Sequence, residues 1–269
     1  MKNPLSYQSL TLFKMRWLLF LPIGLSAQYY TPHLLGVAYT QAALLHEPLN
    51  ANPASAFPQK RLALTAETAT FLPATEIQFY SGGFAFSWDS LQSLSSLLQQ
   101  WGFDKITQTE IGLGYAARFF QRRLTLAVRG RLLSTNFSEY GRLRQGTTDI
   151  GFTFRIGQHL FLGGYGYNLL ARGWGFLPGH IQYGIGLAYV PVPTAQILTE
   201  ITHQAYAPEV HTAFVYNPHD LLVLRGGISL PVLRVGAGLS LRYKSISLDI
   251  GYAYQPATGS WASAGLSLP

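Results

Sequence analysis

The sequence predicts an all-β fold, a transmembrane antiparallel up-and-down β-barrel. Only 12% of its 269 residues are charged, against roughly 25% in a soluble globular domain. After the N-terminus, no run approaches the ~18 apolar residues that a membrane-spanning helix requires. The chain is also rich in glycine and aromatic residues, with Gly 27, Tyr 16, Phe 16 and Trp 5. Membrane barrels combine these features.

The stretch SISLDIGYAY, residues 245–254, shows the alternation that carries this prediction. Successive side chains of an extended strand point to opposite faces. One face here is aliphatic and ends in Tyr252 and Tyr254, while the other is small or polar and holds Asp249. A strand of a soluble sandwich would alternate in the same way. The low charge content of the chain therefore favours lipid, rather than a protein core, as the environment of the apolar face.

The same pattern recurs along the chain and predicts about 12 to 14 strands, and bacterial single-chain barrels take even numbers. Fourteen is favoured, since 14 strands of about 10 residues use nearly all of the chain after Arg61. The expected strands cover 111–119, 124–133, 149–156, 159–167, 181–190, 195–203, 209–216, 221–229, 233–243, 245–254 and 261–268, with two or three more in 62–88. The barrel is therefore expected to occupy residues 62–269.

The first 27 residues have the features of a secretory signal peptide. Lys14 and Arg16 precede an apolar core that ends in the small pair Ser26 and Ala27, which predicts cleavage before Gln28. An uncleaved anchor helix is the alternative, although the apolar run is short for a bilayer. Met15 is a second candidate start. Loss of this leader lowers the net charge from +7 to +4, and no basic cluster indicates nucleic-acid binding.

Two segments lack strand alternation. Residues 28–61 are rich in alanine, proline and asparagine, and we expect them to form a plug inside the barrel. Residues 89–101 place Leu91, Leu94, Leu98 and Trp101 at helical spacing after a cap at Asp89, which predicts a short loop helix. That helix could pack against the barrel, dock a partner or lie in the interfacial layer of the membrane.

The N-terminal stretch GVAYTQAALLHEPLNANPASAF, residues 36–57, resembles the opening of the long-chain fatty-acid transporter (FadL) superfamily, whose Asn-Pro-Ala motif is matched by Asn52, Pro53 and Ala54. The C-terminal region looks like the PorV/PorQ branch found in Bacteroidetes. That branch has Leu-Arg-Gly, Gly-x-Gly and Leu-Asp in three successive strands, and the matching residues here are Leu224-Arg225-Gly226, Gly236-Ala237-Gly238 and Leu248-Asp249. The resemblance implies a barrel of 14 strands with an N-terminal plug, in the outer membrane of a Gram-negative bacterium.

If the aliphatic face meets lipid, the opposite face directs a network of charged residues into the lumen. Its expected members are Arg118, Arg129, Arg131, Asp149, Arg155, Glu200, Arg225, Arg234, Arg242 and Asp249. Arginine facing lipid at mid-membrane would cost about 2 to 4 kcal/mol, which supports the inward assignment. The arginines could attract anionic solutes, or they could pair with acids and hold the barrel closed; we expect Asp249 to pair with Arg234 or Arg242.

The sequence carries no recognisable catalytic motif, and neither an enzyme nor a cofactor is expected. H-E-x-x-H, G-x-S-x-G and a phosphate-binding glycine loop are absent, as is cysteine. His203 and His211 flank a turn and could approach each other to bind a metal, or could be polar groups of the rim. No metal site is predicted.

Three functions fit these observations. The first, favoured by the resemblance of the C-terminal region, is an accessory or partner-binding component of a larger type IX secretion or surface-attachment complex. The second is passage of a lipophilic or amphiphilic ligand past the plug and sideways through the wall, where glycines in 162–168 and 171–176 could allow a gap. The third, an open porin, is disfavoured by a filling plug.

Overall fold

The computed structural model describes residues 34, 37, 40–42, 51–58, 61–170, 172–174, 181–204 and 207–268. The predicted leader lies outside these described residues, as do parts of the predicted plug. Within the described part of the chain, no helix is long and apolar enough to cross a membrane.

Among the residues that the structure describes, fifteen strands follow the short 3₁₀ helix η2 (Pro53–Ala56). The strands are β1 (Leu62–Phe71), β2 (Gln78–Ser87), β3 (Gln92–Phe103), β4 (Ile106–Phe119), β5 (Leu124–Phe137), β6 (Gly141–Arg155), β7 (Leu160–Tyr167), β8 (Arg172–Trp174), β9 (Gln182–Val192), β10 (Ala195–Gln204), β11 (Ala207–His219), β12 (Leu222–Leu230), β13 (Arg234–Tyr243), β14 (Ile246–Gln255) and β15 (Gly259–Leu268).

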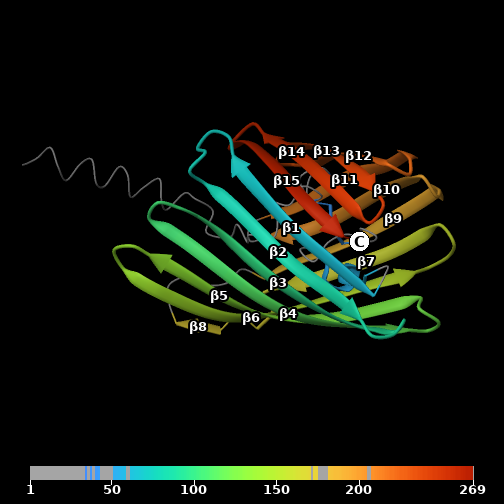
Figure 1. The fold of residues 1–269 in the computed structure, drawn as a ribbon, viewed down its shortest axis with the longest axis horizontal. Helices are drawn as coiled ribbons and strands as arrows, with labels where there is room; N and C mark the ends of the chain where they lie inside the picture. The colour runs from blue at the N-terminus through green and yellow to red at the C-terminus, as the bar shows by residue number, and fades with distance from the viewer. Residues whose placement is uncertain are drawn as a thin grey trace, which may run out of the picture.

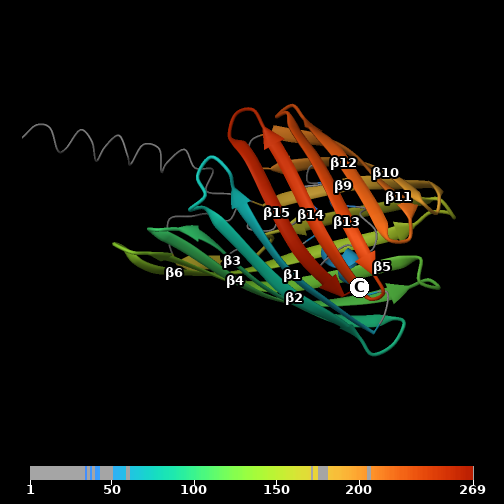
Figure 2. The same cartoon turned by 45° about the horizontal axis from the view of Figure 1, so that its top comes forward.

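The strands form one antiparallel sheet that closes on itself (Figures 1 and 2). Each strand from β1 to β7 pairs with the next, β7 pairs with β9, each strand from β9 to β15 pairs with the next, and the first and last strands pair from Leu64 with Leu268 to Phe71 with Trp261. In the described residues, the short strand β8 pairs with β6 on the same edge as β7, further along β6, so it continues the place of β7 and the closed barrel has 14 strands. The prediction of an up-and-down barrel with 14 strands is therefore confirmed.

The two faces of the barrel differ as the alternation predicted. In β14, Ile246, Leu248 and Ile250 are 42 to 52% exposed on the outside, whereas Asp249 is 1% exposed inside. The same pattern repeats around the ring, so that the outer surface is a continuous apolar band. An apolar surface of this extent would be unstable in water, and it fits the hydrocarbon core of a membrane.

The helix predicted for residues 89–101 is wrong, because this segment forms the turn before β3 and most of β3 itself. Leu94 and Leu98 point outward at 48% and 54% exposure, while Leu97 and Gln99 are buried inside. Backbone pairing with β2 and β4 along its whole length stabilises the strand. Asp89 does cap backbone N–H groups, those of Leu91 and Gln92, but in a turn rather than at a helix.

The barrel has two different ends. We call the end where β1 begins and β15 finishes the terminal rim; its turns are residues 88–91, 120–123, 156–159, 193–194, 220–221 and 244–245. The opposite end, the loop rim, carries the longest connection, from Tyr167 of β7 to Gln182 of β9.

Strand β7 is interrupted on its way to the loop rim. The ladder of β6 with β7 runs from Arg155 to Ile150, and β6 pairs again with β8 at 144–146. Strand β7 leaves β9 after Tyr167 pairs with Gln182. The glycine-rich stretch that sequence analysis singled out therefore does contain a break in the strand ladder.

Candidate functional site

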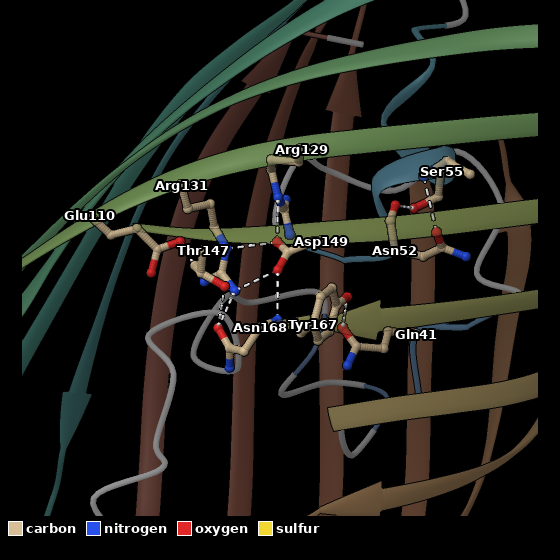
Figure 3. A network of polar contacts seen from close by, with 11 residues as sticks. Gln41, Asn52, Ser55, Glu110, Arg129, Arg131, Thr147, Asp149, Tyr167 and Asn168 are labelled. Atoms are coloured by element: carbon tan, nitrogen blue, oxygen red, sulfur yellow. Dashed lines mark hydrogen bonds and ion pairs between the residues drawn. The ribbon is translucent and has the colours of Figure 1, made fainter. Parts of the chain in front are cut away.

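The predicted Asn-Pro-Ala motif lies in the barrel interior and contacts β4, β5 and β6 through η2 (Figure 3). Asn52 is completely buried. Its side-chain amide donates to the carbonyls of Ala42 (2.7 Å) and Phe152 (2.9 Å), and its Oδ1 accepts from Ala54 N–H at 3.0 Å. Asn52 thus joins two parts of the plug to the wall, and proline at the first position of η2 suits the short helix.

A glycine in the wall makes room for this asparagine. A Cβ atom at Gly151 of β6 would lie 2.0 Å from Asn52 Oδ1. No real side chain is accommodated at that distance, so the close approach of the plug requires glycine here.

We expect Gly151→Ala to displace Asn52 and to loosen the plug. Loss of the three Asn52 hydrogen bonds, at about 0.5 to 1.5 kcal/mol each, weakens docking by about 2 to 4 kcal/mol. Because the chain has no cysteine, maleimide labelling of an Ala56→Cys reporter measures the effect, and labelling should accelerate. The matched control is Gly130→Ala in β5, where a Cβ meets nothing within 4 Å; equal acceleration in both variants would contradict the docking role.

Glu200 of β10 holds a second part of the plug. Its Oε2 accepts from the backbone N–H groups of Gln41 (2.6 Å) and Ala42 (2.5 Å), and its Oε1 accepts from the hydroxyl of Tyr165 (2.9 Å). Charge-assisted hydrogen bonds of this kind are roughly twice as strong as neutral ones. One buried carboxylate therefore binds two consecutive main-chain donors of the plug.

Two stacked tyrosines link this carboxylate to the neighbouring charges. The rings of Tyr165 and Tyr167 on β7 lie 4.4 Å apart, and the Tyr167 hydroxyl donates to Gln41 Oε1 at 3.2 Å. The side chain of Arg129 lies over the Tyr167 ring, 5.9 Å from its centroid. The plug, the last residues of β7 and the charged lumen are thus in direct contact.

A buried ion cluster lies beside the tyrosines (Figure 3). Arg129 Nε donates to Asp149 Oδ2 at 3.0 Å, and Arg131 bridges Asp149 (Nη2 to Oδ1, 2.7 Å) and Glu110 (Nη1 to Oε1, 2.9 Å). All four side chains are almost fully buried. Sequence analysis expected more arginines than acids in the lumen. Within this cluster the charges balance, because two arginines pair with two carboxylates.

The cluster also holds the point where β7 is interrupted. Asn168, in a left-handed conformation (φ 59°), accepts from Arg131 Nη2 at 2.8 Å, and its backbone N–H donates to Asp149 Oδ1 at 3.1 Å. Thr147 of β6 also donates to the Asn168 side chain, at 3.3 Å. These bonds replace the ladder bonds that β6 loses where β7 ends.

Of the other residues of the predicted charge network, Arg118, Arg225, Arg234 and Asp249 are partly or fully buried, whereas Arg155 and Arg242 are exposed and their predicted position in the lumen is wrong. Arg118 stacks over the ring of Phe57 at 3.5 Å, Arg225 contacts Ser240, and Arg155 and Arg242 are exposed at the terminal rim. Arg234 pairs with Glu209 at 2.6 Å. Asp249 accepts from the hydroxyls of Ser247 and Ser267, and its pairing with Arg234 or Arg242 stays a prediction.

The two histidines considered for a metal site lie on opposite faces of the wall. His203 stacks on Tyr183 with ring centroids 5.0 Å apart, whereas His211 is buried inside between Thr202 and Ser229. The metal interpretation of this pair is therefore wrong. Among the residues that the structure describes, no group of His, Cys, Asp and Glu has the arrangement of a metal site.

Several residues of the site had not been predicted from the sequence. Glu110 occupies an inward position of β4, and extending the alternation of that strand by one residue would have found it. Gln41, Tyr165, Tyr167 and Asn168 meet only through contacts between distant parts of the chain, which no local pattern indicates.

Comparison with known proteins shows the same fold in solved structures. No protein-family model matches the chain, and no curated protein matches it either. The Ralstonia pickettii toluene transporter TbuX is similar at 10% identity over 90% of this chain and 98% of that one, with a TM-score of 0.65. The CymD monoaromatic hydrocarbon channel (9%, 88% and 96%, 0.68) and a Pseudomonas aeruginosa FadL homologue (11%, 88% and 97%, 0.64) are comparably similar. The chain thus shares the barrel fold of these solved structures.

Proposed function

We propose that this chain is a FadL-like channel in the outer membrane of a Gram-negative bacterium, and that it passes hydrophobic or amphiphilic small molecules. The observation that carries the proposal is the way in which the plug is held. Its described residues are docked by hydrogen bonds to Glu200 and through Asn52, which can break and re-form. The related barrels include structures named as hydrocarbon channels and toluene transporters, which supports this choice of cargo.

In the proposed mechanism, hydrogen bonds to Glu200 and close approach to the wall at Gly151 and Gly186 hold the plug in its closed position. The buried ion cluster keeps the shape of the wall. A ligand enters the barrel and displaces residues 40–42. The two hydrogen bonds from the plug N–H groups to Glu200 then break, and the ligand makes apolar contacts with the barrel. Arg129, Arg131, Asp149 and Glu110 are joined to one another by ion pairs, so the wall at the end of β7 keeps its structure while the plug moves.

The accessory role in type IX secretion, which the C-terminal resemblance favoured, now has less support. The helix that would have docked a partner is strand β3, whose leucines Leu94 and Leu98 belong to the outer apolar band. The resemblance to the PorV/PorQ branch and the origin in Bacteroidetes rest on the sequence motifs alone. Isolation of a stoichiometric secretion protein with the barrel would favour this second function.

A reversible cross-link between plug and wall tests the proposal. A Cβ at Gly186 of β9 would lie 3.3 Å from Ala42 Cβ, close to the separation in disulfides. The double variant Ala42→Cys/Gly186→Cys should therefore form a disulfide that locks residue 42 to the wall. Uptake of a fluorescent fatty acid or of an aromatic hydrocarbon into liposomes is then measured with the variant oxidised and reduced.

We expect uptake by the wild-type barrel, loss of uptake in the oxidised variant and recovery after reduction. The reduced variant controls for strain, because the new Cβ at Gly186 also lies 2.8 Å from the carbonyl oxygen of Thr199. Equal uptake by empty liposomes and by liposomes containing the wild-type barrel would reject the channel function. Uptake that persists in the oxidised state would reject movement of the plug.

A further inference from the structure

Three arginines gather on two neighbouring turns of the terminal rim. Arg122 and Arg123 lie in the turn between β4 and β5, and Arg155 is the last residue of β6. The backbone N–H of Arg155 donates to the carbonyl of Arg123 at 2.8 Å, which places the two turns side by side. All three residues are exposed. We call them the arginine patch.

The patch lies at the edge of the apolar band. On β4 the outward residues are apolar from Ile111 to Phe119, and Phe119 is the last residue of the strand. Phe120 and Ile156, in the same two turns, are 72% and 49% exposed. A barrel strand crosses the membrane in about 9 to 11 residues, which is the length of the apolar stretch from Ile111 to Phe119. The arginines follow directly after this stretch and therefore lie at the level of the lipid headgroups.

The patch is not compensated by acids of its own rim. In the described part of the chain, no salt bridge joins Arg122, Arg123 or Arg155 to a carboxylate. The acids in the turns of this rim are Asp89 and Asp220, and Asp89 accepts from the backbone of its own turn. At the loop rim, in contrast, Lys105 pairs with Glu139 at 3.3 Å.

The backbone of the first turn is strained in a way that presents these side chains. Phe120, Gln121 and Arg122 are three consecutive non-glycine residues with positive φ, at 50°, 57° and 67°. Such residues are uncommon outside glycine and cluster where a particular presentation of side chains is needed. Here the turn presents an exposed phenylalanine beside two arginines.

We propose that the arginine patch binds the phosphate of an anionic phospholipid in the leaflet around the terminal rim. Guanidinium groups bind phosphate oxygens with paired, charge-assisted hydrogen bonds. Phe120 and Ile156 contact the adjoining acyl chains, as amphipathic pairs of basic and apolar side chains do at membrane interfaces. This proposal does not rest on the proposed channel function.

The test uses the full chain in zwitterionic detergent with an equimolar mixture of phosphatidylglycerol and phosphatidylcholine, and native mass spectrometry counts the lipids retained. We expect a preference for phosphatidylglycerol that falls about fivefold for each patch arginine removed. Arg122→Gln/Arg123→Gln should therefore lose the preference. Arg142→Gln/Arg144→Gln, which removes the same charge at the loop-rim end of β6, should keep it. Resistance to denaturation in gel migration confirms that both variants fold.

Several results would overturn the proposal. They are equal retention of both lipids by the wild type, an equal decrease in the two double variants, and stronger retention of lipid A than of phosphatidylglycerol. The last result would assign the patch to lipopolysaccharide rather than to a phospholipid. Loss of the preference in about 1 M salt, where the Debye length is about 3 Å, would support the electrostatic part of the proposal.

Discussion

Replacement of Arg131 by methionine is expected to destabilise the barrel by about 3 to 5 kcal/mol, the cost of removing one partner from a buried ion pair. Arg131 is the residue that joins Glu110 to Asp149 and also donates to Asn168. Its loss leaves the carboxylate of Glu110 buried without this partner and releases the end of β7. The free energy of unfolding in urea, measured for the barrel refolded into lipid vesicles, checks the expected loss.

Two further variants separate charge from packing in this experiment. Adding Glu110→Gln to Arg131→Met removes the uncompensated charge, and we expect it to recover part of the lost stability. Arg142→Met removes an exposed arginine at the start of β6 and should change stability by no more than about 0.5 kcal/mol. If Arg131→Met and Arg142→Met had the same effect, the cluster would have no structural role.

Replacement of Glu200 by glutamine should release the plug while leaving the barrel folded. The amide has nearly the same shape, but its single carbonyl oxygen cannot accept from Gln41, Ala42 and Tyr165 in the arrangement that the carboxylate satisfies. Loss of charge-assisted bonds worth about 3 kcal/mol corresponds to a roughly hundredfold larger undocked population. Conductance in planar bilayers and labelling of the Ala56→Cys reporter should both increase.

Glu209→Gln is the matched control for this variant. Glu209 is also a buried acid of the lumen wall, on the adjacent strand β11, but it pairs with Arg234. The Glu209→Gln variant should leave conductance unchanged, since Arg234 lies in the wall rather than in the plug. A closed, well-folded Glu200→Gln barrel would show that the two N–H bonds do not hold the plug.

The alternation of apolar and small residues was enough to predict the strands and their two faces. It succeeded at β14 because every position of residues 245–254 obeys the pattern. It failed at β3, where Ser96 interrupts the outward apolar side, Leu97 lies on the inward side, and Leu91, Leu94, Leu98 and Trp101 fall by chance at helical spacing. There the hydrogen-bond ladder to two neighbouring strands outweighed the local pattern.

The candidate site was predicted only in part. Inward charge was expected at Arg129, Arg131, Asp149 and Glu200, and the structure places all four in the lumen. Their partners could not be predicted from local sequence patterns, since Glu200 binds plug residues that precede it by 158 and 159 positions. The roles of Gly151 and Gly186 could not be predicted either, because the residues that they accommodate come from another part of the chain.

The position of the plug also constrains the order in which the molecule can be assembled. The described plug residues contact strands between β2 and β11, among them β4, β5, β6 and β10, whereas the ring closes between its first and last strands, β1 and β15. A barrel that closed first would have to admit the N-terminal segment through its finished rim. We therefore expect the plug to bind to the strands while the sheet is still open. Pairing of β1 with β15 is then the last step, and it closes the barrel around the plug.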